Sequence, residues 1–214
     1  MTYDEYYSPG QLRIIASYVK EPPAWFLLGG PGRANEMQTA RELWPLVKGV
    51  GVELSETAVA WQHAHGWPAD CHLFRAALSD YVGDALLEDP GEDMLHGRVY
   101  FPRGVPAPGD VPALPLCPTT TWDELDKVYG PFHDAAMWLD VEGSEEAALL
   151  GAENLFDTGR VRLVNVELLA SPDDRAGLDR VDRIHRMMTL WGFNAVEDWN
   201  AGPECRDRVY VFQE

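Results

Sequence analysis

Short apolar runs alternate with stretches of helical period in the first third of the chain. The run Trp25–Leu28 ends at a glycine-rich turn, as a buried strand does. Ser55 stands where its side chain would cap a following helix. The pattern predicts the order β-α-β-α-β, with strands over residues 25–28, 49–54 and 71–77 and helices over 36–46 and 56–65.

The alternation returns in the last third of the chain. Ala135–Leu139 predicts a buried strand, and Ser144 stands at the N-cap of the helix that follows. Residues 160–168 predict another strand. A helical stripe then ends at Gly192, a residue suited to a C-terminal cap, and two strands over 193–199 and 208–212 form an antiparallel hairpin. The stripe consists of Leu178, Val181, Ile184, Met188 and Trp191.

This order predicts an α/β fold, a mostly parallel sheet with helices on both faces, in one domain over residues 1–214. The segment 83–118 holds seven of the sixteen prolines, so we expect mostly loop there, with a short edge strand over 98–101. Residues 1–20 predict a helical segment. Its tyrosines either pack or form a lid over a substrate: Tyr3, Tyr6, Tyr7 and Tyr18.

Acidic residues outnumber basic ones by 35 to 17, which gives a formal net charge of −18. Such a field repels nucleic acid and anionic lipid, because affinity for phosphate polymers depends on cationic side chains. The arginines between residues 173 and 186 alternate with aspartates, and this spacing predicts a solvated helix face. They are Arg175, Arg180, Arg183 and Arg186.

The sequence also indicates the cellular compartment of the protein. No apolar run approaches the ~20 residues that span a bilayer, and the first ten residues, MTYDEYYSPG, lack the basic-then-apolar order of a secretory signal. Cys71, Cys117 and Cys205 are widely spaced, which argues against a disulfide framework or a structural zinc site. We expect a cytoplasmic protein.

Ligands of open parallel sheets bind beyond the carboxyl ends of the strands, so the residues that follow each strand are the candidates. Gly29, Gly30 and Gly32 follow the first strand and would let the backbone approach a ligand. Glu53 ends the second strand, 24 residues after Gly29, near the spacing at which an acid accepts ribose hydroxyls. The turn and the acid favour a nucleoside cofactor; a plain turn and a solvated carboxylate are the alternative.

Carboxylates crowd the junction after the strand 135–139. Glu145 suits the first turn of a helix, where the dipole favours negative charge, but Asp140 has no such explanation. Asp140 could bind a cofactor amine, take a proton from a substrate hydroxyl or help to hold a divalent metal such as Mg²⁺. Glu142 lies in the same loop, and Glu167, near the end of the next strand, should lie beside Asp140.

The segments MWLDVEGSEEAALLGAENLF (137–156) and VRLVNVELL (161–169) resemble the FkbM-type methyltransferases, whose pattern has an Asp-Val-Glu-Gly block and then a strand ending in Glu. Further segments of the chain resemble that family in the same order. They are Gly51-Val52-Glu53, Ala76-Ala77-Leu78-Ser79-Asp80, Thr119–Leu125 and Gly192-Phe193. The chain departs from the family at Leu27, where an acid is usual, and at Trp138, where a lysine is usual.

The resemblance implies a class I methyltransferase fold with a seven-stranded sheet, S-adenosylmethionine as cofactor and O-methylation of a sugar or natural product. The candidate catalytic acids are Asp140, Glu142 and Glu167. The resemblance implies that Asp140 faces the transferring methyl group. A divalent metal such as Mg²⁺ is a possible cofactor but is not favoured. The remaining cofactor contacts implied are Gly29, Gly30 and Gly32 at the methionine end, Glu53 and Leu54 at the ribose, and Ala77, Leu78, Ser79 and Asp80 at the adenine.

The leading hypothesis is therefore an S-adenosylmethionine-dependent O-methyltransferase that acts on a small hydroxylated molecule. Transfer to a nitrogen or a carboxylate is one alternative. A non-catalytic module that keeps the fold and binds a partner is another, and dinucleotide binding is a third. A homodimer is an open option.

Overall fold

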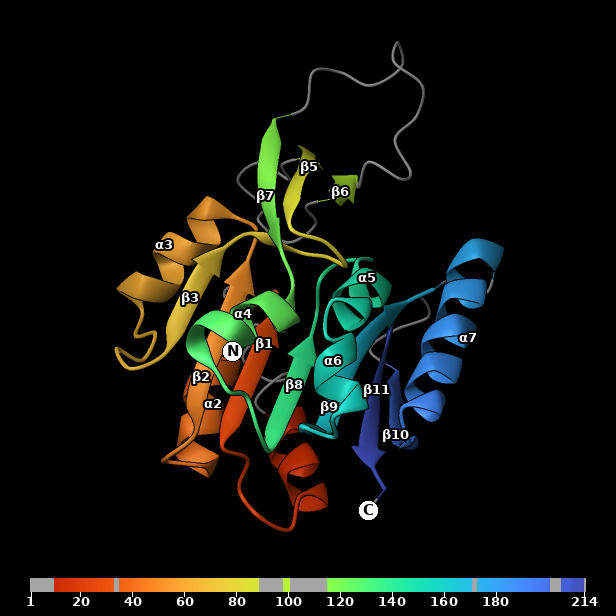
Figure 1. Ribbon diagram of the computed structural model, residues 1–214, viewed down its shortest axis with the longest axis horizontal. Helices are drawn as coiled ribbons and strands as arrows, with labels where there is room; N and C mark the ends of the chain where they lie inside the picture. Colours follow the sequence, from red (N-terminus) through yellow and green to blue (C-terminus); the bar gives the residue numbers. More distant parts are fainter. Residues whose placement is uncertain are drawn as a thin grey trace.

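The computed structural model describes residues 10–32, 35–88, 98–100, 115–170, 173–200 and 205–213. A mostly parallel seven-stranded sheet runs through the molecule in the order β10-β11-β9-β8-β1-β2-β3 (Figure 1). Only β11 departs from the parallel arrangement, because it runs antiparallel to both β9 and β10. The strands are β1 (Trp25–Gly29), β2 (Lys48–Glu53), β3 (His72–Arg75), β8 (Ala135–Leu139), β9 (Val161–Leu169), β10 (Phe193–Asn200) and β11 (Cys205–Phe212).

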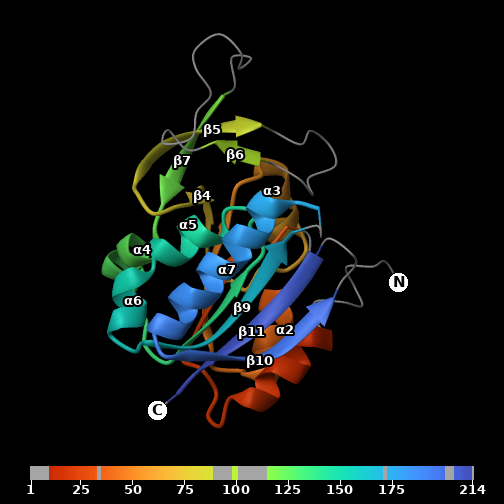
Figure 2. The ribbon, with the colours of Figure 1, turned by 90° about the vertical axis from the view of Figure 1, so that its right-hand side faces the viewer.

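Helices cover both faces of the sheet, as predicted for the α/β fold (Figure 2). Residues 10–15 are also helical and continue into the 3-10 turn η1 (Ala16–Tyr18). Residues 1–9, with three of the four tyrosines considered for a lid, lie outside the described residues. The helices are α2 (Glu36–Leu43), α3 (Glu56–Ala64), α4 (Trp122–Tyr129), α5 (Glu145–Leu150), α6 (Glu153–Asp157) and α7 (Arg175–Leu190).

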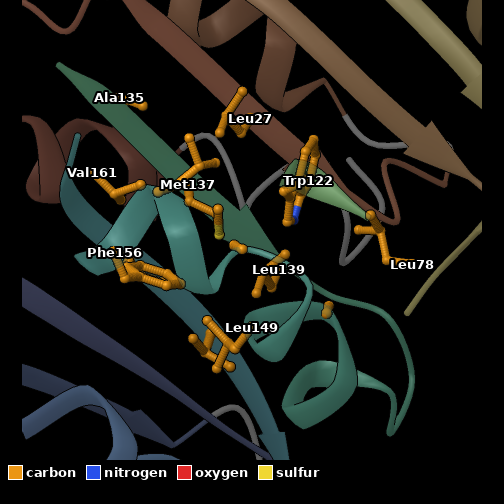
Figure 3. Packing of buried hydrophobic residues seen from close by; sticks show 14 of the residues in the cluster. Leu27, Leu78, Trp122, Ala135, Met137, Leu139, Leu149, Phe156 and Val161 are labelled. Atoms are coloured by element: carbon orange, nitrogen blue, oxygen red, sulfur yellow. The ribbon is translucent and has the colours of Figure 1, made fainter. Parts of the chain in front are cut away.

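The two faces of the sheet bury separate apolar clusters, because successive side chains of a strand point to opposite faces. Leu27, Met137 and Leu139 pack with the helices α4 to α7 (Figure 3). Phe26 and Trp138, on the other face, pack with helical segment 10–15 and α2. All five strand residues are at most 3% exposed, which explains why their strands have continuous apolar sequences.

The segment 83–118, expected to be mostly loop, contributes strands to a second sheet in the order β4-β7-β5-β6. This small sheet stands beyond the end of the large sheet where β3 and β8 finish (Figures 1 and 2). Ala85 and Leu87 are buried and pack with Cys117 and, from β2's end, Leu54. The strands are β4 (Ala77–Leu78), β5 (Gly83–Glu88), β6 (Arg98–Tyr100) and β7 (Leu116–Thr120).

The predicted helix signals have mixed outcomes. Ser55 caps α3, since its side chain accepts a hydrogen bond from the Ala58 amide, and Gly192 follows α7 with φ +85°. Ser144 occupies the N-cap position of α5, but its side chain makes no capping hydrogen bond. The strand predicted to end at Ala77 ends at Arg75. No helix among the described residues is long and apolar enough to cross a membrane.

Candidate functional site

The glycine turn after β1 is packed against the loop after β8. The Asp140 amide donates to the Gly29 carbonyl at 3.0 Å, and the Gly30 amide donates to Val52 O at 2.9 Å. Gly30 has φ +72°, and a Cβ built there would lie 1.7 Å from the Asp140 carbonyl oxygen. Gly30 is therefore required both for its conformation and for the close approach of two backbones. The predicted cofactor turn and the predicted catalytic acid meet at this point.

Glu53 is tied to the glycine turn by backbone hydrogen bonds. Its two carboxylate oxygens accept from the amides of Gly32 at 2.8 Å and Ser55 at 2.7 Å. Burial raises the pKa of Glu53, and these amide donors act in the opposite direction. Gln62 of α3, a residue that the sequence reasoning missed, holds the same turn by donating to Pro31 O and Gly32 O.

The segment Ala77–Asp80, predicted at the adenine, lies beside the same edge. Leu78 contacts the end of β1, because a Cβ at Gly29 would lie 2.7 Å from Leu78 Cδ1. Ser79 is fully buried, and a Cβ at Gly151 would lie 2.0 Å from the Ser79 carbonyl oxygen. The main chain of this segment is therefore held between the glycine turn and the C-terminal end of α5, while Asp80 is exposed.

Three carboxylates converge at the ends of β8 and β9, as predicted. Asp140, Glu142 and Glu167 each offer an oxygen, and these oxygens lie within 4.8 Å of one another. The carboxyl groups of Asp140 and Glu167 are close enough for a proton held on one acid to be donated to the other. Glu142 has φ +51° and precedes Gly143 at φ +98°, so the loop turns sharply between β8 and α5. A side chain in this left-handed region carries strain of about 1–3 kcal/mol, as is common at functional sites.

Burial and the neighbouring acids raise the pKa of Asp140. Removal from water raises its pKa well above the ordinary value, and the nearby charges of Glu167, Glu142 and Asp207 raise it further. Asp207 of β11 lies directly opposite Glu167 in the strand pair. Burial and the Glu167 charge raise the pKa of Asp207 to about 6. Asp140 and Asp207 therefore keep their protons to higher pH than isolated carboxylates do.

The loop that carries Glu142 is braced from α5 and α7. Glu145 is fully buried, accepts from the Gly143 amide at 2.7 Å, and burial raises its pKa to about 7. Arg180 donates to Gly143 O at 3.4 Å, and Arg183 forms a two-pronged ion pair with Glu146. The arginines of α7 were predicted to form a solvated face. Two of them instead contact this region: Arg180 binds the loop, and Arg183 binds α5.

The donor and acceptor groups at this edge fit an adenosine cofactor. A Cβ at Gly32 would meet open space, with its nearest neighbour 4.0 Å away, so the turn presents accessible backbone. Each oxygen of Glu53 accepts one amide and retains capacity for a ribose hydroxyl. The spacing of Asp140, Glu142 and Glu167 also suits the oxygen ligands of a divalent cation.

The sequence matches no protein-family model and no curated protein. The structure is similar to an rRNA methylase of Streptococcus thermophilus, at 10% identity and a TM-score of 0.56, with 97% of each chain covered. It is also similar to fibrillarin of Aeropyrum pernix with natively bound S-adenosylmethionine, at 9% identity and a TM-score of 0.55 over 97% of this chain and 76% of that one. The chain has the fold of the class I S-adenosylmethionine-dependent methyltransferases.

Proposed function

We propose that this protein transfers the methyl group of S-adenosylmethionine to a hydroxyl of a small metabolite, sugar or natural product, as an FkbM-type methyltransferase. The contact between the glycine turn and the acidic cluster carries this proposal. The Asp140 amide binds Gly29 O, and the Asp140 carboxyl binds Glu167. A methyl donor held by the turn and a hydroxyl held by the acids would therefore meet at one place.

The cofactor half would use backbone and one acid. Gly29, Gly30 and Gly32 would hold the methionine end, and Glu53 with Leu54 would hold the ribose. The segment 77–80 would lie along the adenine. Bound S-adenosylmethionine supplies a methyl group that its positive sulfur already activates, so the protein's main task is to align the hydroxyl with it.

The acidic cluster would bind the acceptor and take its proton. A raised pKa makes the ionised carboxylate of Asp140 a stronger base than an ordinary aspartate, which suits proton removal from a hydroxyl. Glu167 would share that proton through its hydrogen bond with Asp140. Glu142 would orient the acceptor from the loop, since its strained backbone aims the loop back toward the strand ends.

The charge of the chain favours a small acceptor over a nucleic acid. The Streptococcus thermophilus neighbour is an rRNA methylase, but a net charge of −18 opposes binding of a polyanion. Arg183 and Arg180, near the acidic loop, are engaged by Glu146 and Gly143. We also propose that the protein acts in the cytoplasm, apart from nucleic acid and membranes; its mass in solution would decide between monomer and homodimer.

The test is methyl transfer from tritiated S-adenosylmethionine to a panel of a neutral sugar, a phenol, an amine and a carboxylic acid. Wild type should label a hydroxyl probe, and Asp140→Asn should lower the rate at least about a hundredfold. Asp134→Asn is the matched control: it lies at the other end of β8 and pairs with Arg162 on the surface.

The panel separates the alternatives. Label on the amine or the carboxylic acid alone would replace O-methylation with the corresponding transfer. No transfer to any probe, together with no cofactor binding, would favour a non-catalytic module.

A further inference from the structure

A buried polar bridge joins helical segment 10–15 to the strand pair β9–β11. Gln11 Nε2 donates to one oxygen of Asp207 at 2.9 Å, and Asn165 Nδ2 donates to the other at 3.5 Å. The exposed fractions of the three residues are 8%, 7% and 0% respectively. Because a buried carboxylate is costly without donors, the two carboxamides are what make Asp207 tolerable there.

The bridge ends beside the acidic cluster. Asp207 lies directly opposite Glu167 across β11 and β9, which places their Cβ atoms about 5 Å apart. Asn165 is two residues before Glu167 and so shares its face of the sheet. Glu167 in turn is hydrogen-bonded to Asp140. Gln11 is thus linked to Asp140 through two intervening acids.

Attachment of the helical segment alone does not require this bridge. Leu12 and Ile15 are fully buried against Phe26 and Trp138, so apolar packing already fastens the segment. An acid placed opposite another acid in a strand pair is unfavourable, and a buried charge network is commonly less stable than apolar residues of similar size. An acid at this costly position indicates a role beyond holding the helix.

We propose that Gln11 and Asp207 are positioning residues of the acceptor side of the site, which fix the Glu167 carboxylate in its contact with Asp140. Gln11 holds Asp207 in place, and Asp207 restricts where its partner across the strands can lie. Neither residue touches the reacting atoms. The effect on catalysis rests on the proposed function, whereas the geometry of the acid pair does not.

Three variants separate this role from simple packing. Gln11→Leu removes the donor, and Gln11→Glu sets a carboxylate against Asp207. The double variant Gln11→Glu with Asp207→Asn exchanges donor and acceptor: the amide at 207 donates to the acid at 11 and still accepts from Asn165. Arg13→Leu is the control in the same segment, since Arg13 makes an exposed ion pair with Glu42.

The first readout needs neither cofactor nor acceptor. In carbon-13 carboxyl NMR at one fixed pH, Gln11→Leu should shift the side-chain carboxyl resonances of Asp140 and Glu167, while Arg13→Leu leaves them in place. Hydrogen–deuterium exchange of residues 10–15 reports the attachment separately. Faster exchange in Gln11→Leu with unmoved carboxyl resonances would show that the bridge only fastens the helical segment, and would overturn the proposal.

The second readout is catalysis. With the hydroxyl probe that wild type methylates, Gln11→Leu and Gln11→Glu should lower kcat about tenfold or more, with the affinity for S-adenosylhomocysteine unchanged. The double variant should recover most of kcat; failure to recover, with normal exchange, would contradict the proposal. Shifted carboxyl resonances in a protein that binds no cofactor would refute the proposed function and leave the positioning of the acid pair intact.

Discussion

The proposed site at the carboxyl ends of the strands has two halves, one for the cofactor and one for the acceptor. Carboxylates are stabilised by hydrogen-bond donors in the first half and lie beside other acids in the second. In the cofactor half, Glu53 is matched by two backbone amides, from Gly32 and Ser55. In the acceptor half, Asp140 and Glu167 face one another, and Asp207 adds a third negative charge. The cofactor half is thus built as a satisfied binding surface. The acceptor half holds charges that lower the free energy of unfolding, as is typical of groups that serve catalysis.

The largest effect should come from the junction between the halves. Gly30→Ala forces a Cβ against the Asp140 carbonyl oxygen and also strains a backbone at φ +72°. We expect a loss of about 3–5 kcal/mol in the free energy of unfolding, measured in urea. Gly32→Ala, at φ +48° but facing open space, is the matched control and should lose about 1 kcal/mol. Equal losses would show that the halves are not packed as described.

The next effect separates stability from activity in the acceptor half. Asp140→Asn removes a charge surrounded by Glu167, Glu142 and Asp207 and leaves an amide that can donate to Glu167. We expect the free energy of unfolding at pH 8 to rise by about 1–3 kcal/mol while methyl transfer is lost. Asp134→Asn should lower stability by less than about 1 kcal/mol, since it breaks only an exposed pair. A destabilised Asp140→Asn would contradict the picture of mutual repulsion.

Glu145 gives the acceptor half a pH dependence. Its folded-state pKa of about 7 lies above its ordinary 4.5, so the folded protein binds more protons than the unfolded chain between these values. The free energy of unfolding should therefore fall as the pH rises from about 4.5 to 7, by at most about 3 kcal/mol from this group. Glu145→Gln should flatten that part of the pH profile. Glu146→Gln, which breaks the pair with Arg183, should leave the slope as it is.

The smallest effect concerns metal. Although oxygens of three carboxylates lie within 4.8 Å of one another, we expect methyl transfer to depend on positioning and proton removal without a resident cation. Addition of EDTA should leave the transfer rate within about twofold of the untreated enzyme. Loss of activity in EDTA with recovery in Mg²⁺ would make the acidic cluster a metal centre.

The large sheet was predictable because its inner strands are buried on both faces and so have continuous apolar sequences. Ala135–Leu139 was predicted with the bounds that the structure shows. Within the small sheet, the short edge strand predicted over 98–101 is confirmed by β6 (Arg98–Tyr100). Strands β5 and β7 were missed, and in β7 the alternation is short and interrupted, with buried Cys117 and Thr119 flanking Pro118. Helix α4 was missed because Trp122 and Leu125 are its only buried residues among four charged ones.

The candidate site was predictable where it follows parallel strands, which explains Asp140, Glu53 and Glu167. Asp207 escaped because β11 is antiparallel, so the residue at the same edge lies near the strand's beginning. Gln11 comes from a helical segment far away in the sequence, and no local pattern marks it. The available signal was Asp207 itself, a polar residue on the otherwise apolar face of β11. This signal becomes informative only when the pairing of β11 with β9 is known.

Calorimetric titration with S-adenosylhomocysteine is the measurement that shows whether this edge of the sheet binds S-adenosylmethionine. NAD serves as the control ligand, since a glycine turn with a spaced acid also occurs in dinucleotide sites. We expect micromolar binding of S-adenosylhomocysteine, weakened by Glu53→Gln, and no heat with NAD. Binding of NAD alone, or of neither ligand, would show that this edge is not a site for S-adenosylmethionine.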